Sequence, residues 1–306
     1  GVFSHYFIGL GRTRIVMHVN LWVLLINIPL SYYLIHHGVF GSWDGLKGAA
    51  LGTGISHILI FGLYLWLWLA NEKPNKTALR KTFAFDFTEI KRIVYFGFPI
   101  GIEYFLLFFA FSTFTNFFHS YGEVEAISMT AVFNWDILAT LPIWGLNIGI
   151  SALAGKYIGE QRHDLAYQTT LSGAKIALTV VGLFSLSFLT IGQQMIAVFL
   201  PSPADLGENY SSTLSLSYHM LLGVSFYCLA NATSLVVTAT LRASGDSRWC
   251  MGTAEFTNWI MLSSTFICIR FLEFPPLLTW WIFIVCSITL ALLDLQRFLR
   301  GGWKEK

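Results

Sequence analysis

Two acidic residues of this 306-residue chain, Glu103 and Asp136, lie inside long apolar stretches, and they are the residues best placed to bind a cation. An ionisable side chain at the centre of a bilayer costs at least about 2.5–3.5 kcal/mol on insertion scales, so an acid at that depth is a functional candidate. Two carboxylates at one depth on consecutive helices could face a shared cavity. There they could bind Na⁺ through their oxygens or hold a proton. The alternative is that each acid only forms a hydrogen bond to a neighbouring helix.

Glu103 follows a proline by one helical turn. Pro99, in the run GFPIG, lacks a backbone donor and predicts a bend in its helix. Carbonyl oxygens that lose their partners at such a bend are ready cation ligands. Tyr104 and Phe108 are candidates for an aromatic pocket that holds a lipophilic cation, although rings in such a run more often face lipid.

Two asparagines extend this set of polar candidates. Asn134 lies two residues before Asp136, and Asn231 lies inside a later apolar segment, where its amide could bond a substrate or a carboxylate. Glu255 lies close to a predicted helix end and could reach the interface. The four cysteines have no metal-binding spacing. We therefore expect no metal site and no cofactor, with Na⁺ or H⁺ as the coupling ion.

The elements that must position these residues are transmembrane helices. The chain is 55% hydrophobic and 12% charged, whereas soluble domains have about 45–50% apolar and about 25% charged residues. About 20 apolar residues are needed for a helix to cross a bilayer. Eight segments meet that length, which predicts an all-α polytopic bundle embedded in lipid: 15–37, 48–69, 91–117, 125–153, 167–199, 212–240, 250–272 and 277–296. The net charge of +2 is too small to indicate a nucleic-acid partner.

The basic residues alternate between the two sides of this bundle. One set of connections holds only Lys47 and Arg270. The other set holds Arg12, Arg14, Lys73, Lys76, Arg80, Lys81, Lys91, Arg92, Lys156, Arg162, Arg242, Arg248, Arg297, Arg300, Lys304 and Lys306. Because basic loops stay cytoplasmic, the second set and the C-terminus are predicted to lie inside the cell. The polar stretch at 70–90 is the one candidate linker, and it is either an amphipathic surface segment or a plain solvated loop.

A weak internal repeat relates two of these inner connections. At a fixed offset of 234 residues, the run GLGRTRIVM at residue 9 aligns with ASGDSRWCM at residue 243. Gly11 then matches Gly245, and Arg14 matches Arg248. Both copies directly precede a predicted helix, as expected for the duplicated halves of a transporter.

Four segments in this order carry a resemblance to a known family: FIGLGRTRIVMHVNLWVLLINIPLSYYLI, GFPIGIEYFLLFFAF, ALAGKYIGEQRHDLAYQTT and TLRASGDSRW. The chain resembles the multidrug and toxic compound extrusion (MATE) family. The resemblance implies twelve helices in two six-helix lobes and exchange of organic cations or other small molecules for Na⁺ or H⁺. It aligns this chain with the last two helices of the first lobe (1–69), a cytoplasmic linker (70–90) and the complete second lobe (91–306). We therefore expect a fragment that lacks roughly four helices of a protein that is a monomer at full length.

The resemblance also shows two departures from the Na⁺-coupled branch of the family. That branch has an acid where this chain has Leu107, and its acid on the tenth helix falls at Asn231. The second-lobe cation pair of the branch is therefore not intact. Glu103 together with Asp136 is a substitute proposed from depth.

Three functions remain as hypotheses. The first is a secondary antiporter of the bacterial inner membrane that exports small cationic or amphipathic compounds. The second is a flippase for lipid-linked sugars, which would favour a cavity rich in Arg and Lys. The third is a membrane-embedded hydrolase or transferase that uses Asp136 with Glu255 or Asp246, although the sequence contains no HExxH or GxSxG motif. We expect a transporter and not an enzyme.

The charge distribution predicts the sidedness of the linker. With the native cysteines replaced, Lys76→Cys should react with a membrane-impermeant maleimide only in inverted vesicles, because the basic connections lie inside. Lys47→Cys, in an outer connection, should react only in intact cells. Labelling of Lys76→Cys in intact cells would overturn the predicted topology.

Overall fold

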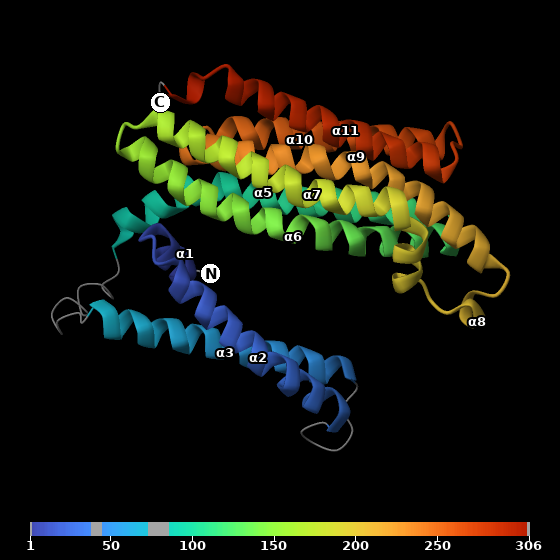
Figure 1. Cartoon of the computed structure of the whole chain (residues 1–306), viewed down its shortest axis with the longest axis horizontal. Helices are drawn as coiled ribbons and strands as arrows, with labels where there is room; N and C mark the ends of the chain where they lie inside the picture. Colours follow the sequence, from blue (N-terminus) through green and yellow to red (C-terminus); the bar gives the residue numbers. More distant parts are fainter. Residues whose placement is uncertain (1, 38–44, 73–85, 305–306) are drawn as a thin grey trace. The chain divides into compact units, whose positions relative to one another are not determined.

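The structure is a computed structural model that describes residues 2–37, 45–72 and 86–304. Within these ranges the regular elements are all helices, which confirms the all-α prediction (Figure 1). Three of them are short: α1 (Val2–Gly9), α8 (Pro203–Leu206) and a 3₁₀ helix (Gly302–Lys304). The long ones are α2 (Thr13–His37), α3 (Gly45–Glu72), α5 (Phe87–His119), α6 (Glu123–Gly159), α7 (His163–Phe199), α9 (Asn209–Ala243), α10 (Ser247–Arg270) and α11 (Pro276–Leu299).

Each of the eight predicted spans corresponds to one of these long helices, although the span predicted at 250–272 runs two residues past the end of α10. Six of them, among the described residues, are both long and apolar enough to cross a membrane: α2, α3, α6, α7, α9 and α11. The chain is therefore an integral membrane protein. Several helices run past the predicted spans, as α6 does up to Gly159, because hydrogen bonding and not hydropathy decides where a helix ends.

The chain divides into two compact units, Gly1–Phe87 and Thr88–Lys306. The linker predicted at 70–90 lies mostly outside the described residues, so its amphipathic character remains a prediction.

In unit 1, helices α2 and α3 approach closely near the end of α2. A Cβ at Gly48 would lie 2.4 Å from the Leu34 carbonyl oxygen, so only glycine allows this contact. Asn27 Nδ2 donates to Ser56 Oγ at 2.8 Å and pins the same pair of helices.

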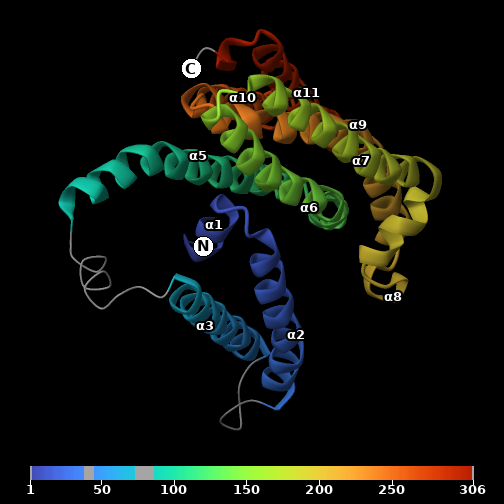
Figure 2. The ribbon, with the colours of Figure 1, turned by 60° about the vertical axis from the view of Figure 1, so that its left-hand side comes forward.

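Unit 2 is organised around α9, which packs against α6, α7, α10 and α11 (Figures 1 and 2). Half of the apolar stretch of α9 is buried, the largest share among the six candidate spans of the described residues. One core cluster joins these helices, and its aromatic part includes Phe114, Phe133, Trp280 and Phe283. Trp280 Nε1 donates to the Met220 carbonyl oxygen at 3.1 Å, so the largest core ring also satisfies its polar atom.

The internal repeat is visible in the two turns that it relates. Gly11 and Gly245 both have positive φ, +73° and +89°. The amide of Arg12 donates to the Phe7 carbonyl at 2.9 Å, and the matching amide of Asp246 donates to the Leu241 carbonyl at 2.9 Å. Each turn thus closes one helix with a left-handed residue and starts the next within four residues. The equivalence of these turns is confirmed, while superposition of the helices that follow remains a prediction.

Tyr121 joins two turns at the opposite end of unit 2. Its hydroxyl donates to the Phe274 carbonyl oxygen and accepts from Thr279 Oγ1, each at 2.7 Å. Burial raises the pKa of Tyr121 above its usual value, so the hydroxyl stays protonated and remains a donor. The contact ties the α5–α6 turn to the α10–α11 turn.

Removing this hydroxyl should destabilise unit 2. We expect Tyr121→Phe to lower the free energy of unfolding by about 1 kcal/mol, because the Phe274 carbonyl loses its donor. Thermal unfolding in detergent measures the effect. Tyr32→Phe is the control, since Tyr32 is exposed and its hydroxyl makes no hydrogen bond within the described residues. Equal melting temperatures for the two variants would contradict the prediction.

Candidate ion-coupling site

Asp136 is a buried carboxylate inside a membrane-spanning helix. It lies on α6, 13 residues after Glu123, which corresponds to about 20 Å along the helix axis. Its exposed fraction is 9%. Thr140 Oγ1 and Cys228 Sγ each donate to its Oδ1 atom at 3.4 Å. A carboxylate with two long hydrogen bonds to one oxygen keeps capacity for a further ligand.

The packing of α6 forces Asp136 into this position. Val132, Ala139 and Ile143 lie four residues before, three after and seven after it, and all three are fully buried. Residues at these spacings share one helix face. The face packs against α9, where Cys228 donates to Asp136. Asp136 therefore lies on the buried face of α6, and its carboxylate is part of the α6–α9 interface.

This arrangement suits a small cation or a proton. Oxygen atoms of carboxylate and hydroxyl groups are the ligands preferred by hard cations such as Na⁺. Asp136 and Thr140 of α6 supply such oxygens. A bound proton would instead turn Asp136 into a donor and remove the cost of a buried charge.

Glu103 occupies the middle of α5, 16 residues from either end of that helix. Its side chain and that of Pro99 lie outside the described residues, so a shared cavity with Asp136 remains a prediction. The helix continues through Pro99, and Figure 2 shows α5 as a curved helix. Tyr104 and Phe108, the predicted aromatic pocket, are 51% and 68% exposed.

Neither predicted asparagine bonds to Asp136. Asn231 lies three residues after Cys228 on α9, and Asn134 lies two residues before Asp136 on α6. Both are partly exposed, and neither side chain forms a hydrogen bond within the described residues. A ligand role for either asparagine therefore remains a prediction.

Sequence reasoning missed Asp294, a second buried acid. It lies on α11, is 2% exposed and accepts a hydrogen bond of 2.5 Å from Ser234 Oγ on α9. The sequence feature that could have identified Asp294 is its place inside the last predicted span, close to the inner end of that span. Glu255, on α10, is partly buried.

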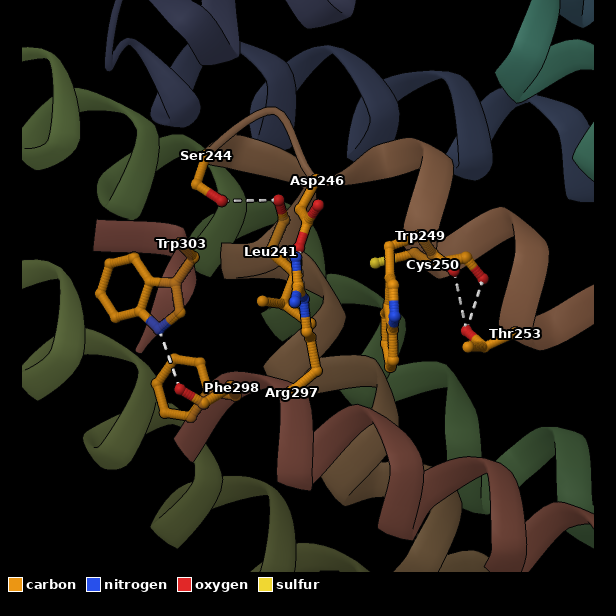
Figure 3. A network of polar contacts seen from close by, with 9 residues as sticks. All are labelled: Leu241, Ser244, Asp246, Trp249, Cys250, Thr253, Arg297, Phe298 and Trp303. Atoms are coloured by element: carbon orange, nitrogen blue, oxygen red, sulfur yellow. Dashed lines mark hydrogen bonds and ion pairs between the residues drawn. The ribbon is translucent and has the colours of Figure 1, made fainter. Parts of the chain in front are cut away.

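A network of polar and aromatic contacts closes the predicted inner end of unit 2 (Figure 3). Arg297 Nε on α11 donates to Asp246 Oδ2 in the α9–α10 turn at 2.8 Å, and its guanidinium lies over the ring of Trp249. Trp303 is fully buried, stacks on Phe298 and donates to the Phe298 carbonyl oxygen at 3.0 Å. The last described residues are thereby folded back onto the bundle.

Comparison with known proteins identifies the family. The MatE family profile matches residues 99–267, more than half of the chain and the segment that contains Asp136 and Cys228. The chain belongs to the MatE family. The predicted resemblance is confirmed.

Curated relatives of this MatE chain are named as probable multidrug resistance proteins. The chain is 25% identical over 256 residues to "Probable multidrug resistance protein NorM" of Bacillus subtilis, covering 83% of this chain and 54% of that protein. It is 24% identical over 308 residues to the protein of the same name from Thermotoga maritima, covering 100% and 64%. The chain therefore spans between about half and two thirds of the length of these two relatives.

Solved structures share the fold. A "MOP superfamily transporter from Pyrococcus furiosus" superposes with a TM-score of 0.81 at 16% identity, over 97% of this chain and 64% of that one. A crystal structure described as "MATE in complex with MaL6" gives a TM-score of 0.79 at 16% identity, over 97% and 65%. At this identity the likeness establishes the helical architecture alone.

The Asp246–Arg297 pair should contribute measurably to stability. The side chains of Asp246 and Arg297 are 4% and 30% exposed, so the pair is neither fully exposed nor fully buried. A surface pair contributes about 0–1 kcal/mol to stability, whereas removing one partner of a buried pair costs about 3–5 kcal/mol. We expect Arg297→Gln to lower the free energy of unfolding by about 2 kcal/mol, measured by denaturation in detergent.

The exposed pair of Lys156 and Glu160, 3.9 Å apart, provides the matched control. Glu160→Gln should change the free energy of unfolding by less than about 0.5 kcal/mol. Asp246→Asn combined with Arg297→Gln should lose less than the sum of the single changes, since both remove one interaction. Strict additivity would show that the pair makes no net contribution.

Proposed function

We propose that this chain is part of a secondary antiporter that exports small organic compounds, cationic or amphipathic, in exchange for Na⁺ or H⁺. The observation that carries the proposal is Asp136, a buried carboxylate that two helices hold inside the spanning region. The names of the curated relatives support multidrug export. Because the chain spans about half to two thirds of those proteins, the activity is proposed for the whole protein.

The chemistry of Asp136 supports ion exchange. A buried carboxylate is costly when charged and unpaired, so binding of Na⁺ or H⁺ stabilises the conformation that encloses it. A cationic substrate would compete for the same negative charge. Export results when the ion stabilises one of the inward-facing and outward-facing states and the substrate stabilises the other. Each ligand then shifts the equilibrium between the two states by the difference in its affinity for them.

The two alternatives receive less support. A flippase for lipid-linked sugars would need cationic side chains facing a cavity, but Lys175, the basic residue deepest within a described helix of unit 2, is exposed. A hydrolase that uses Asp136 with Asp246 would need the two carboxylates together. Asp246 is instead paired with Arg297 in the α9–α10 turn, and Asp136 lies in the interior of α6.

We also propose that the protein resides in a bacterial inner membrane with its C-terminus in the cytoplasm. The alternation of basic connections supports this orientation, because Arg297, Arg300 and Lys304 follow or end the last spanning helix. The protein is proposed to act as a monomer.

Neutralising Asp136 should uncouple transport from the ion gradient. In inverted vesicles containing the full-length protein, Asp136→Asn should lower gradient-driven uptake per molecule about ten-fold, within the range of typical coupling free energies. Substrate counterflow without a gradient should persist, since Asn keeps the size of the side chain. Glu103→Gln should give a similar or stronger defect if the two acids act together.

Asp205→Asn is the matched control. Asp205 is an exposed carboxylate in α8 that accepts a hydrogen bond from Ser202 Oγ at 2.6 Å, and we expect this variant to retain wild-type uptake. Normal gradient-driven uptake by Asp136→Asn, with protein amount held equal, would remove this carboxylate from the mechanism.

A further inference from the structure

Unit 1 contains an apolar groove that ends at a basic residue. The groove has a volume of about 520 Å³ and lies between α2 and α3. This volume falls within the range of about 300–1,000 Å³ that is typical of small-molecule sites. Its lining residues are Arg14, Ile15, His18, Val19, Trp22, Ile26, Leu63, Trp66 and Leu67.

The groove lies away from the region where the two helices approach each other most closely. The close approach involves Gly48 and Gly52 of α3 with Leu34 and Ser31 of α2, near the end of α2. The groove lies toward the start of α2 and the end of α3. In Figure 2 the two helices converge at the first region and separate toward the second.

The polar groups gather at one end of this groove. Arg14 is the second residue of α2 and is exposed, and His18 follows one turn later with its Nδ1 atom 2.6 Å from the Arg14 carbonyl oxygen. The exposed rings of Trp22 and Trp66 flank the apolar part. A cation next to indole rings and a long apolar cleft matches a phospholipid, whose phosphate lies at the interface and whose acyl chain lies in the hydrocarbon.

The internal repeat, extended from the two turns into the helices that follow them, predicts that the other helices of a lobe leave this face uncovered. At the offset of 234 residues, Trp22 and Ile26 of α2 correspond to Phe256 and Ile260 of α10. Those two residues are 66% and 43% exposed, although unit 2 contains six long helices. We therefore expect the corresponding stripe of α2 to stay accessible to lipid.

We propose that the α2–α3 groove binds one anionic phospholipid, with an acyl chain between Trp22 and Trp66 and the phosphate on Arg14. The site is separate from the ion-coupling residues, so it does not depend on the proposed transport function. Arg14 belongs to the basic connections predicted to lie inside, and the inner leaflet is where anionic lipids attract such residues.

Native mass spectrometry of the full-length protein tests the proposal with two lipids of identical acyl chains, phosphatidylglycerol and phosphatidylcholine. The wild type should retain phosphatidylglycerol more strongly. Arg14→Gln should weaken this retention about five-fold, equivalent to about 1 kcal/mol per basic residue at an anionic surface. Arg12→Gln, which removes a neighbouring charge outside the groove, should leave it unchanged.

The acyl-chain part of the site is tested by filling the groove. Ile26→Trp should reduce retention of both lipids, whereas Ile28→Trp, at an exposed isoleucine of the same helix that does not line the groove, should not. If Ile26→Trp prevents folding, Trp22→Ala replaces it in this comparison. This variant removes one side of the groove and should likewise reduce retention of both lipids. Equal retention of the two lipids by the wild type, or equal behaviour of the filling and control variants, would overturn the proposal. A dimer that Ile26→Trp dissociates would assign the groove to a second copy and overturn it as well.

Discussion

The absence of water in the hydrocarbon core is the constraint on which this structure depends. Backbone amides and carbonyls that cross the membrane must bond within their own helix, because each unpaired group costs several kcal/mol. Helix ends lie outside the hydrocarbon in the predicted topology, and their last backbone groups are bonded within the connecting turns. At Gly11, Gln161 and Gly245 a residue with positive φ closes one helix, and backbone bonds such as Arg162 N to the Tyr157 carbonyl, 2.8 Å, satisfy its last turn. The helix pairs α1–α2, α6–α7 and α9–α10 are thus joined by tight turns.

The same constraint determines how polar side chains are accommodated. Helix α9 supplies donors to two of the buried acids of unit 2, from Cys228 to Asp136 on α6 and from Ser234 to Asp294 on α11. These donors are six residues apart, which corresponds to about 9 Å along the axis. A displacement of α9 would therefore alter the surroundings of both carboxylates together. A central helix with this property is suited to coupling ion binding to a change of conformation.

The fold could be predicted from the sequence because apolar length and basic alternation are local signals. Asp136 could be predicted as buried because its depth in an apolar run follows from counting residues. Its contact with Cys228 could not be predicted, since it depends on which faces of α6 and α9 meet, and the two residues are 92 positions apart. Asp294 was missed because it lies near a predicted helix end, where depth suggests solvent contact. Packing of α11 against α9 buries it instead.

The two copies of the repeated turn show how one backbone shape can serve different electrostatic demands. Position 12 is arginine and the matching position 246 is aspartate, although the backbone bonds agree. Each residue stands directly before or at the start of the next helix, where the helix dipole favours a negative charge by about 0.3–1 kcal/mol. Asp246 satisfies this preference and also binds Arg297 at 2.8 Å. Arg12 opposes the dipole, and the positive charge instead matches the predicted cytoplasmic side of the connection. One backbone shape thus holds a basic residue at position 12, in a connection predicted to be cytoplasmic, and an acidic residue at position 246 that binds Arg297.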